Sequence, residues 1–81
     1  MMFKVGSIYK THNMMFKIGS VYKHNSCLDI CFRVETVEEK ENGDVRLLGL
    51  WLNQHYDMLV ICSDDITITK DRIHQWRELN V

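Results

Sequence analysis

The chain contains no proline, only four glycines and three cysteines in 81 residues, and its apolar runs are short. Without proline-rich or glycine-rich stretches, no segment has the composition of a linker or a low-complexity tract. The longest apolar stretches, residues 47–52 and 58–62, are far shorter than the roughly 20 residues that a membrane-spanning helix needs. No apolar run or cleavage site follows the first methionines, so we expect no signal peptide, no membrane and a cytoplasmic location.

The odd number of cysteines argues against a disulfide framework. Cys27 and Cys31, with His24 nearby, have a spacing that invites a metal site. If this segment is a strand, however, residues four apart lie about 13 Å from each other. Two thiolates cannot share a zinc ion, at about 2.3 Å each, across that distance. We therefore expect free thiols, no metal and no cofactor.

Charge is unevenly distributed, although the formal net charge is only −1. Residues 1–25 hold four lysines and no acid, a net of +4, whereas residues 26–81 hold six basic and eleven acidic residues, a net of −5. The basic arm either lies beside the acidic body or faces an external anion.

What the chain does contain is an internal repeat at its start. Residues 1–10 read MMFKVGSIYK and residues 14–23 read MMFKIGSVYK, an offset of thirteen with eight of ten positions identical. We expect residues 1–13 to form an extra strand or arm and residues 14–81 to form one small domain. The copy left out of the domain should pair with a sheet edge or a second chain, which predicts a homodimer or larger closed assembly. The alternative is that residues 1–13 have no function.

The pattern along the domain is that of short strands. Residues 16–23 are β-branched and aromatic around Gly19, which predicts a strand with a bend. Residues 28–35 alternate cleanly between apolar and polar. Asn42-Gly43 predicts a two-residue type I′ hairpin, and the strand that returns over residues 45–52 is apolar on both faces, with Leu48, Leu50 and Leu52 on the outer one.

The remaining segments predict further short elements. Residues 58–62 suggest a buried strand, 63–65 a turn and 66–69 another strand. Ile73, Trp76 and Leu79 recur every three residues, which favours one short helical turn. The fold class expected is mainly β: a strongly bent small barrel of about five strands, SH3-like in preference to OB-like at this length. Its predicted core is Leu28, Ile30, Phe32, Val34, Leu47, Trp51, Val60 and Ile68.

Two short patterns resemble those of bacteriophage proteins. The opening Lys17-x-Gly19-Ser20-x-Tyr22-Lys23-His24 and the closing Ile66-Thr67-Ile68, followed by Trp76, are similar to short bacteriophage-encoded proteins predicted to be SH3-like barrels. The resemblance covers residues 16–79 as a pattern of strands and brings no catalytic motif. It implies a protein that works by binding: blocking a host enzyme, occupying a defence protein or sequestering a signalling nucleotide.

Two other functions compete with this interpretation. Cys31, Cys62, His55 and Asp57 supply the parts of a nucleophilic site, but their spacing does not bring them together, so we expect no enzyme. Nucleic-acid binding is the alternative function, and its surface would be Lys17, Tyr22, Lys23 and Arg33. The acidic body and a pI near 6.4 oppose it.

The segment most suited to a ligand or partner follows the returning strand. It combines flat aromatic faces with amide donors and acceptors, a mixture that suits a nucleobase or a protein hot spot: Trp51, Asn53, Gln54, His55 and Tyr56. The competing interpretation is structural, with Trp51 and Tyr56 capping the core and the amides holding a turn. Trp76 is expected to close the core. The leading hypothesis is a non-catalytic, self-associating binding protein that inhibits or sequesters a host component.

Overall fold

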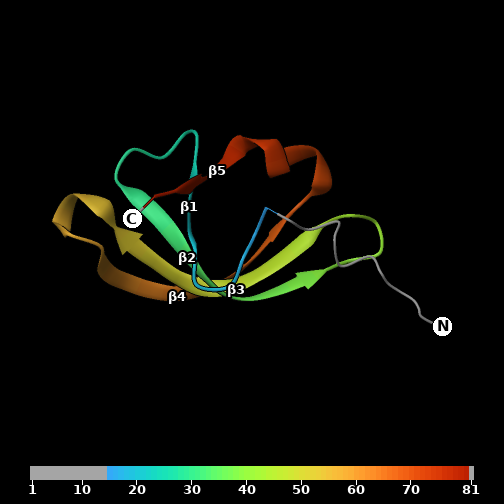
Figure 1. Cartoon of the computed structure of the whole chain (residues 1–81), viewed down its shortest axis with the longest axis horizontal. Helices are drawn as coiled ribbons and strands as arrows, with labels where there is room; N and C mark the ends of the chain where they lie inside the picture. The colour runs from blue at the N-terminus through green and yellow to red at the C-terminus, as the bar shows by residue number, and fades with distance from the viewer. Residues whose placement is uncertain (1–14, 81) are drawn as a thin grey trace.

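A computed structural model describes residues 15–80. Five antiparallel strands form one sheet in the order β4-β3-β2-β1-β5, so the mainly β fold is confirmed. The strands are β1 (Val21–His24), β2 (Ile30–Glu39), β3 (Val45–Asn53), β4 (Leu59–Ile68) and β5 (Trp76–Leu79), with 3₁₀ turns η2 (Gln54–Tyr56) and η3 (Lys70–Gln75). Figure 1 shows β2, β3 and β4 as a curved floor, with β5 and η3 above it. Within the described residues β4 and β5 do not pair, so the sheet is not closed into a barrel.

The main core lies on the face of the sheet that carries Phe32, which we call the inner face. Alternate residues of a strand point to the same side, so Phe32 and Val34 of β2 share this face, and both are completely buried there together with Leu47 of β3. Tyr22 of β1, opposite Phe32, belongs to the same cluster. The pairing of β2 with β3 shifts register between Val34 and Thr36, and such a bulge bends a strand.

A second, smaller cluster lies on the opposite, outer face. Cys31 and Leu52 are paired across β2 and β3 and are buried together with Val21. The two-faced apolar pattern of β3 is explained by this cluster, since Leu52 is covered within the chain. Leu48, on the same outer face, remains 40% exposed.

Three of the predicted core residues are wrong. Leu28 is 81% exposed because β2 begins only at Ile30 and Leu28 lies in the bend before it. Ile30 is 38% exposed at the first position of β2, and Val60 is 51% exposed because it lies on the edge strand β4. Trp51 is half-buried, and the other four members of the predicted set are buried: Phe32, Val34, Leu47 and Ile68.

The predicted hairpin joins β2 to β3, but its loop is one residue longer than expected. The Lys40 amide donates to the Asp44 carbonyl at 2.8 Å, and the Gly43 amide donates to the Lys40 carbonyl at 3.0 Å. Gly43 has φ 95°, while Asn42 is not in the left-handed region. This is the three-residue loop in which the last residue is left-handed, a position that suits glycine. Asn42 instead accepts the Asp44 amide through Oδ1 at 3.0 Å.

Two predictions for the C-terminal third are wrong. The strand over residues 58–62 is not buried, because residues 59–62 are exposed on the edge strand β4. Residues 63–65 do not form a turn, because Ser63, Asp64 and Asp65 pair with β3 inside the continuous strand β4. Their charge is accommodated at the exposed edge, where the Arg46 guanidinium holds Asp65 at 2.6 Å. The predicted short helical turn is confirmed as η3, but it ends at Gln75, and residues 76–79 form β5 beside β1.

The predicted bend at Gly19 is confirmed by its φ of 90°, and β1 starts two residues later. Before the bend, the Phe16 ring packs 4.9 Å from the Tyr22 ring. Residues 1–14, and with them the predicted extra strand or arm over residues 1–13, lie outside the described part of the chain. No helix among residues 15–80 is long and apolar enough to cross a membrane.

Candidate functional site

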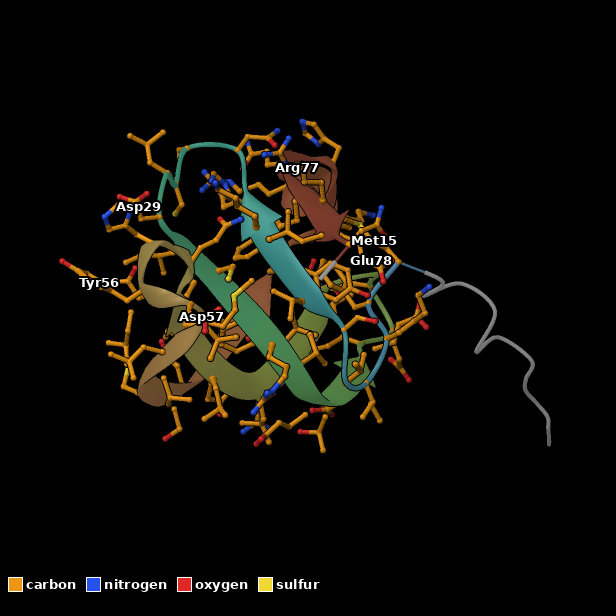
Figure 2. The ribbon with its side chains drawn as sticks, turned by 60° about the vertical axis from the view of Figure 1, so that its left-hand side comes forward. Met15, Asp29, Tyr56, Asp57, Arg77 and Glu78 are labelled. Atoms are coloured by element: carbon orange, nitrogen blue, oxygen red, sulfur yellow. The ribbon has the colours of Figure 1, made fainter. Side chains whose placement is uncertain are left out.

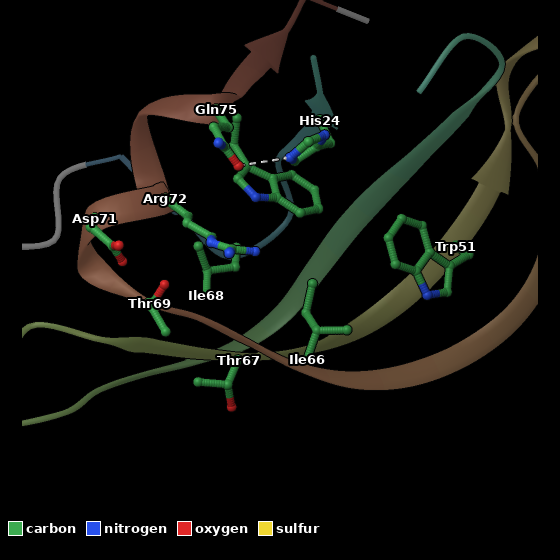
Figure 3. Close-up of a pocket in the computed structure, with 10 residues that line it drawn as sticks. His24, Trp51, Ile66, Thr67, Ile68, Thr69, Asp71, Arg72 and Gln75 are labelled. Atoms are coloured by element: carbon green, nitrogen blue, oxygen red, sulfur yellow. Dashed lines mark hydrogen bonds between the residues drawn. The ribbon is translucent and has the colours of Figure 1, made fainter. Parts of the chain in front are cut away.

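A hollow of about 500 Å³ opens between the inner face of β3 and β4 and the segment formed by η3 and β5 (Figure 3). Residues from four parts of the chain line it, because β5 returns to pair with β1 and carries η3 across the curved sheet. The lining residues are His24, Trp51, Ile66, Thr67, Ile68, Thr69, Asp71, Arg72, Gln75 and Trp76. We call this hollow the tryptophan groove.

Two half-buried indoles define the groove. The ring centroids of Trp51 and Trp76 lie 6.4 Å apart, with their planes tilted by 36°. Trp51 packs edge-to-face on the buried Phe32 ring at 4.8 Å, and its Nε1–H donates to Asp64 Oδ2 at 2.8 Å. That hydrogen bond lowers the pKa of Asp64, since it favours the charged carboxylate. Trp51 is therefore fixed from below by Phe32 and at its edge by Asp64.

A hydrogen-bonded histidine at the edge of the groove links β1 to η3. His24 Nδ1 accepts the Ser26 backbone N–H at 3.1 Å, so the ring proton lies on Nε2. Nε2–H then donates to Gln75 Oε1 at 3.1 Å, the contact drawn in Figure 3. The His24 ring also meets Trp76 edge-on at 5.2 Å. These contacts hold the end of β1 against the end of η3.

One arginine, Arg72, lies on the wall of the groove. Figure 3 shows the Arg72 side chain reaching toward the centre of the groove, while Asp71 lies beside Thr69. Among residues 15–80, the ion pairs involve Lys17 and Arg46 and none reaches Arg72. The Thr69 hydroxyl donates to Asp71 and, as the largest cause, lowers the pKa of that carboxyl. The charge of Arg72 lowers the pKa of Asp71 as well, but none of the ion pairs among residues 15–80 involves the Arg72 guanidinium.

The five residues of the predicted ligand segment do not form one site. Trp51 lies in the groove, whereas the other four belong to the loop around η2. Asn53 Oδ1 accepts a hydrogen bond from the His55 backbone N–H at 3.0 Å, and Gln54 Oε1 accepts one from Lys23 Nζ at 3.3 Å. These two side chains hold the turn, as the structural interpretation expected. Tyr56 is 64% exposed and so does not cap the core; its ring meets the His55 ring edge-on, with the ring centroids 5.0 Å apart. Figure 2 shows Tyr56 projecting from the molecule near Asp29 and Asp57.

The predicted basic surface is also dispersed. Tyr22 is completely buried, which contradicts its assignment to a surface. Its hydroxyl donates to the Met15 carbonyl and accepts the Lys17 amide at 2.7 Å. The Lys17 ammonium lies 3.4 Å from Glu78, and Lys23 Nζ donates to the Leu28 carbonyl at 2.5 Å. Arg33 is half-buried on the outer face, opposite Leu50.

The thiols do not assemble a reactive centre. Burial raises the pKa of the Cys31 thiol, and the Cys31 Sγ lies 3.6 Å from the Met58 sulfur; a thiol kept neutral in apolar surroundings is a poor nucleophile. Cys62 is exposed on β4, and Cys27 lies in the coil before β2 rather than in a strand. Within residues 15–80, no three His, Cys, Asp or Glu residues are grouped so as to hold a metal ion.

His24, Arg72 and Gln75 were not predicted from the sequence as site residues. They lie far from Trp51 along the chain, and only the pairing of β1 with β5 brings them to the groove. No family model, curated protein or solved structure matches the chain.

Proposed function

We propose that this chain is a non-catalytic binding protein that holds a small ligand in the tryptophan groove. The observation that carries the proposal is that both tryptophans of the sequence line the same hollow. Its volume of about 500 Å³ lies in the range typical of small-molecule sites. Aromatic walls with a few polar groups are the usual composition of such sites.

The groups on the walls favour a flat, negatively charged ligand such as a nucleotide. Indole faces stack on nucleobases, and the planar guanidinium of Arg72 suits a phosphate, to which it can donate two parallel hydrogen bonds. The NH₂ of Gln75 has no hydrogen-bond partner among the described residues, because His24 bonds its oxygen. It is therefore free to donate to the edge of a base.

The biological role follows from the resemblance to short bacteriophage proteins. In the proposed role the chain sequesters a signalling nucleotide in the host cytoplasm. In a second version of this hypothesis it binds and blocks a host enzyme or defence protein. The strand order, with a 3₁₀ turn before a last strand that returns to β1, supports an open SH3-like barrel as the fold behind this role.

Self-association is part of the proposal and is assigned to the edge strand β4. Leu59, Val60 and Ile61 are 62%, 51% and 48% exposed on that edge, and β4 pairs on one side only among residues 15–80. An exposed apolar edge is a template for strand pairing, and two copies of β4 would meet across a two-fold axis. Ile61→Lys should lower the mass measured by light scattering, whereas the exposed loop change Glu41→Lys should not.

Tryptophan fluorescence tests the binding site directly, since both fluorophores lie in the groove. Titration with AMP or GMP should give a saturable change. Arg72→Gln should weaken binding roughly 10-fold or more, because a hydrogen bond to a charged group contributes about 1.5–3 kcal/mol. The matched control is Arg77→Gln, an exposed arginine of β5 that does not line the groove (Figure 2).

Two results would contradict the proposal. One is the absence of any fluorescence change with all four nucleoside monophosphates. The other is equal weakening by Arg72→Gln and Arg77→Gln. Salt dependence identifies the alternative, nucleic-acid binding: log K for a single strand falls with log salt by about 0.7 per phosphate contacted. A slope well above that of a single contact, with an oligonucleotide binding more tightly than AMP, would favour that alternative.

A further inference from the structure

The place of β1 in the sheet is defined by a short set of contacts. Tyr22 is fully buried with its hydroxyl bonded to the backbone of Met15 and Lys17. Phe16 packs on the Tyr22 ring. Gly19, at φ 90°, donates its amide to the Val34 carbonyl at 2.7 Å. Any other segment with these groups at the same spacing would fit this place.

Residues 1–10 are such a segment. Tyr9 corresponds to Tyr22, Phe3 to Phe16 and Gly6 to Gly19, at a constant offset of thirteen. The Tyr22 hydroxyl bonds to backbone groups of Met15 and Lys17 in its own copy, which correspond to Met2 and Lys4. The two bonds between β2 and the bend at Gly19 and Ser20 join backbone groups only. They are therefore available to either copy.

The two copies differ at two positions, and the structure can accommodate the residue of the first copy at both. Val5 would replace Ile18, which is 70% exposed, so the smaller side chain loses little contact there. Ile8 would replace Val21, which is 5% exposed in the outer cluster, and adds one methylene to a packed site. The second copy therefore fits better, but the first copy violates no contact of the main core.

We infer that the chain has two interchangeable first strands, and that residues 1–10 can displace residues 14–23 from the place of β1 in the same molecule. The connection to β2 would then run over residues 12–29 instead of 25–29. A longer loop is tolerated because the entropy of loop closure grows only with the logarithm of loop length.

The exchange changes the groove. At the position of His24 the first copy carries Thr11. Threonine cannot reproduce the bond from the His24 ring to Gln75 or the edge-on contact with Trp76. The exchanged form thus lacks the side-chain contacts that hold the first strand against η3 at the groove, while its backbone can still pair with β5. This consequence rests on the proposed function, whereas the exchange itself does not.

A double-mutant cycle on the full chain tests the exchange without any ligand. Tyr9→Ala should leave the melting temperature unchanged. Tyr22→Ala should lower it only in part, because residues 1–10 take the vacated place. The double variant should lose about 15 °C or more, since neither copy then fills the core. Tyr9 and Tyr22 would be strongly coupled although they compete for one site and never meet.

The inference is wrong if the effects of the two substitutions on the melting temperature simply add. In that case Tyr22→Ala would be as destabilised as the double variant, or would be unfolded by itself. Light scattering of the Tyr22→Ala chain separates exchange within one molecule from exchange between two. The mass should stay that of the unmodified chain, and a doubled mass would overturn exchange within the molecule. Failure of nucleotide binding leaves this cycle unaffected, so the two proposals fail independently.

Discussion

Gly49 is the position where a single added methyl group should do most damage. It lies in β3 opposite Val34, at the bend of β2. A Cβ built on Gly49 would lie 2.0 Å from the Arg33 carbonyl oxygen and 2.8 Å from the Phe32 ring. The first neighbour is backbone and cannot rotate away. Because the ring belongs to a completely buried side chain, it has no free space to enter.

The magnitude of the Gly49→Ala effect follows from these contacts. Overpacking a core usually costs about 1–3 kcal/mol. Here β2 must also move away from β3, which weakens neighbouring hydrogen bonds worth about 1 kcal/mol each. We expect a loss of about 3–4 kcal/mol, a large part of the roughly 4–12 kcal/mol that a chain of this length has. The melting temperature should fall by roughly 12–30 °C.

Thermal unfolding followed by circular dichroism measures this effect. The control is Leu48→Ala, a change at the neighbouring residue of the same strand, whose side chain is 40% exposed and should cost much less. If Gly49→Ala has the same melting temperature as the unmodified chain, then β2 does not approach β3 at Gly49 as closely as the structure shows. The curvature that forms the floor of the groove would then be wrong.

Three further predictions concern the core, the acid at the groove and the η2 loop. Phe32→Ala should cost about 3–5 kcal/mol in chemical denaturation, and an unchanged midpoint would contradict its place in the core. The hydrogen bond from Trp51 lowers the pKa of Asp64 in the folded state below its ordinary value of 3.8. The bond therefore stabilises the fold fully at pH values above 3.8, and this stabilisation is lost as the pH falls through the lower pKa of the folded state. Tryptophan emission should report that loss, and Asp64→Asn should remove the transition; a transition that persists would argue against the bond. The double substitution His55→Ala, Tyr56→Ala should alter neither folding nor AMP binding, since both residues are exposed outside the groove. A loss of AMP affinity measured by calorimetry would instead place the binding site in the η2 loop.

Local patterns predicted the elements whose residues carry their own signal. The alternation before Glu35 and the Asn42-Gly43 pair located β2 and its hairpin, because period and turn chemistry are short-range properties. The turn at 63–65 was wrong for a reason of the same kind. Acidic residues favour turns locally, but Asp65 is stabilised in β4 by Arg46, nineteen positions away along the chain.

The candidate site was only partly accessible from sequence. The sequence predicts a site at Trp51 because amide residues follow it, yet those amides hold the η2 turn, and the residues that line the groove with Trp51 are distant along the chain. Trp76 is predicted to close the core; it is half-buried and packs against the main core, and it also lines the groove. What joins the two indoles is the return of β5 to β1, a long-range pairing that leaves no mark on the local pattern.

The central claim is that the tryptophan groove is the binding site, and nuclear magnetic resonance tests it most directly. The sequence has two tryptophans, so a ¹⁵N spectrum contains two indole N–H signals. On titration with AMP, both should shift together with the Gln75 side-chain amide and the Arg72 guanidinium. Shifts confined to Lys17, Lys23 and Arg33, or to residues 53–56, with both indole signals unmoved, would contradict the account.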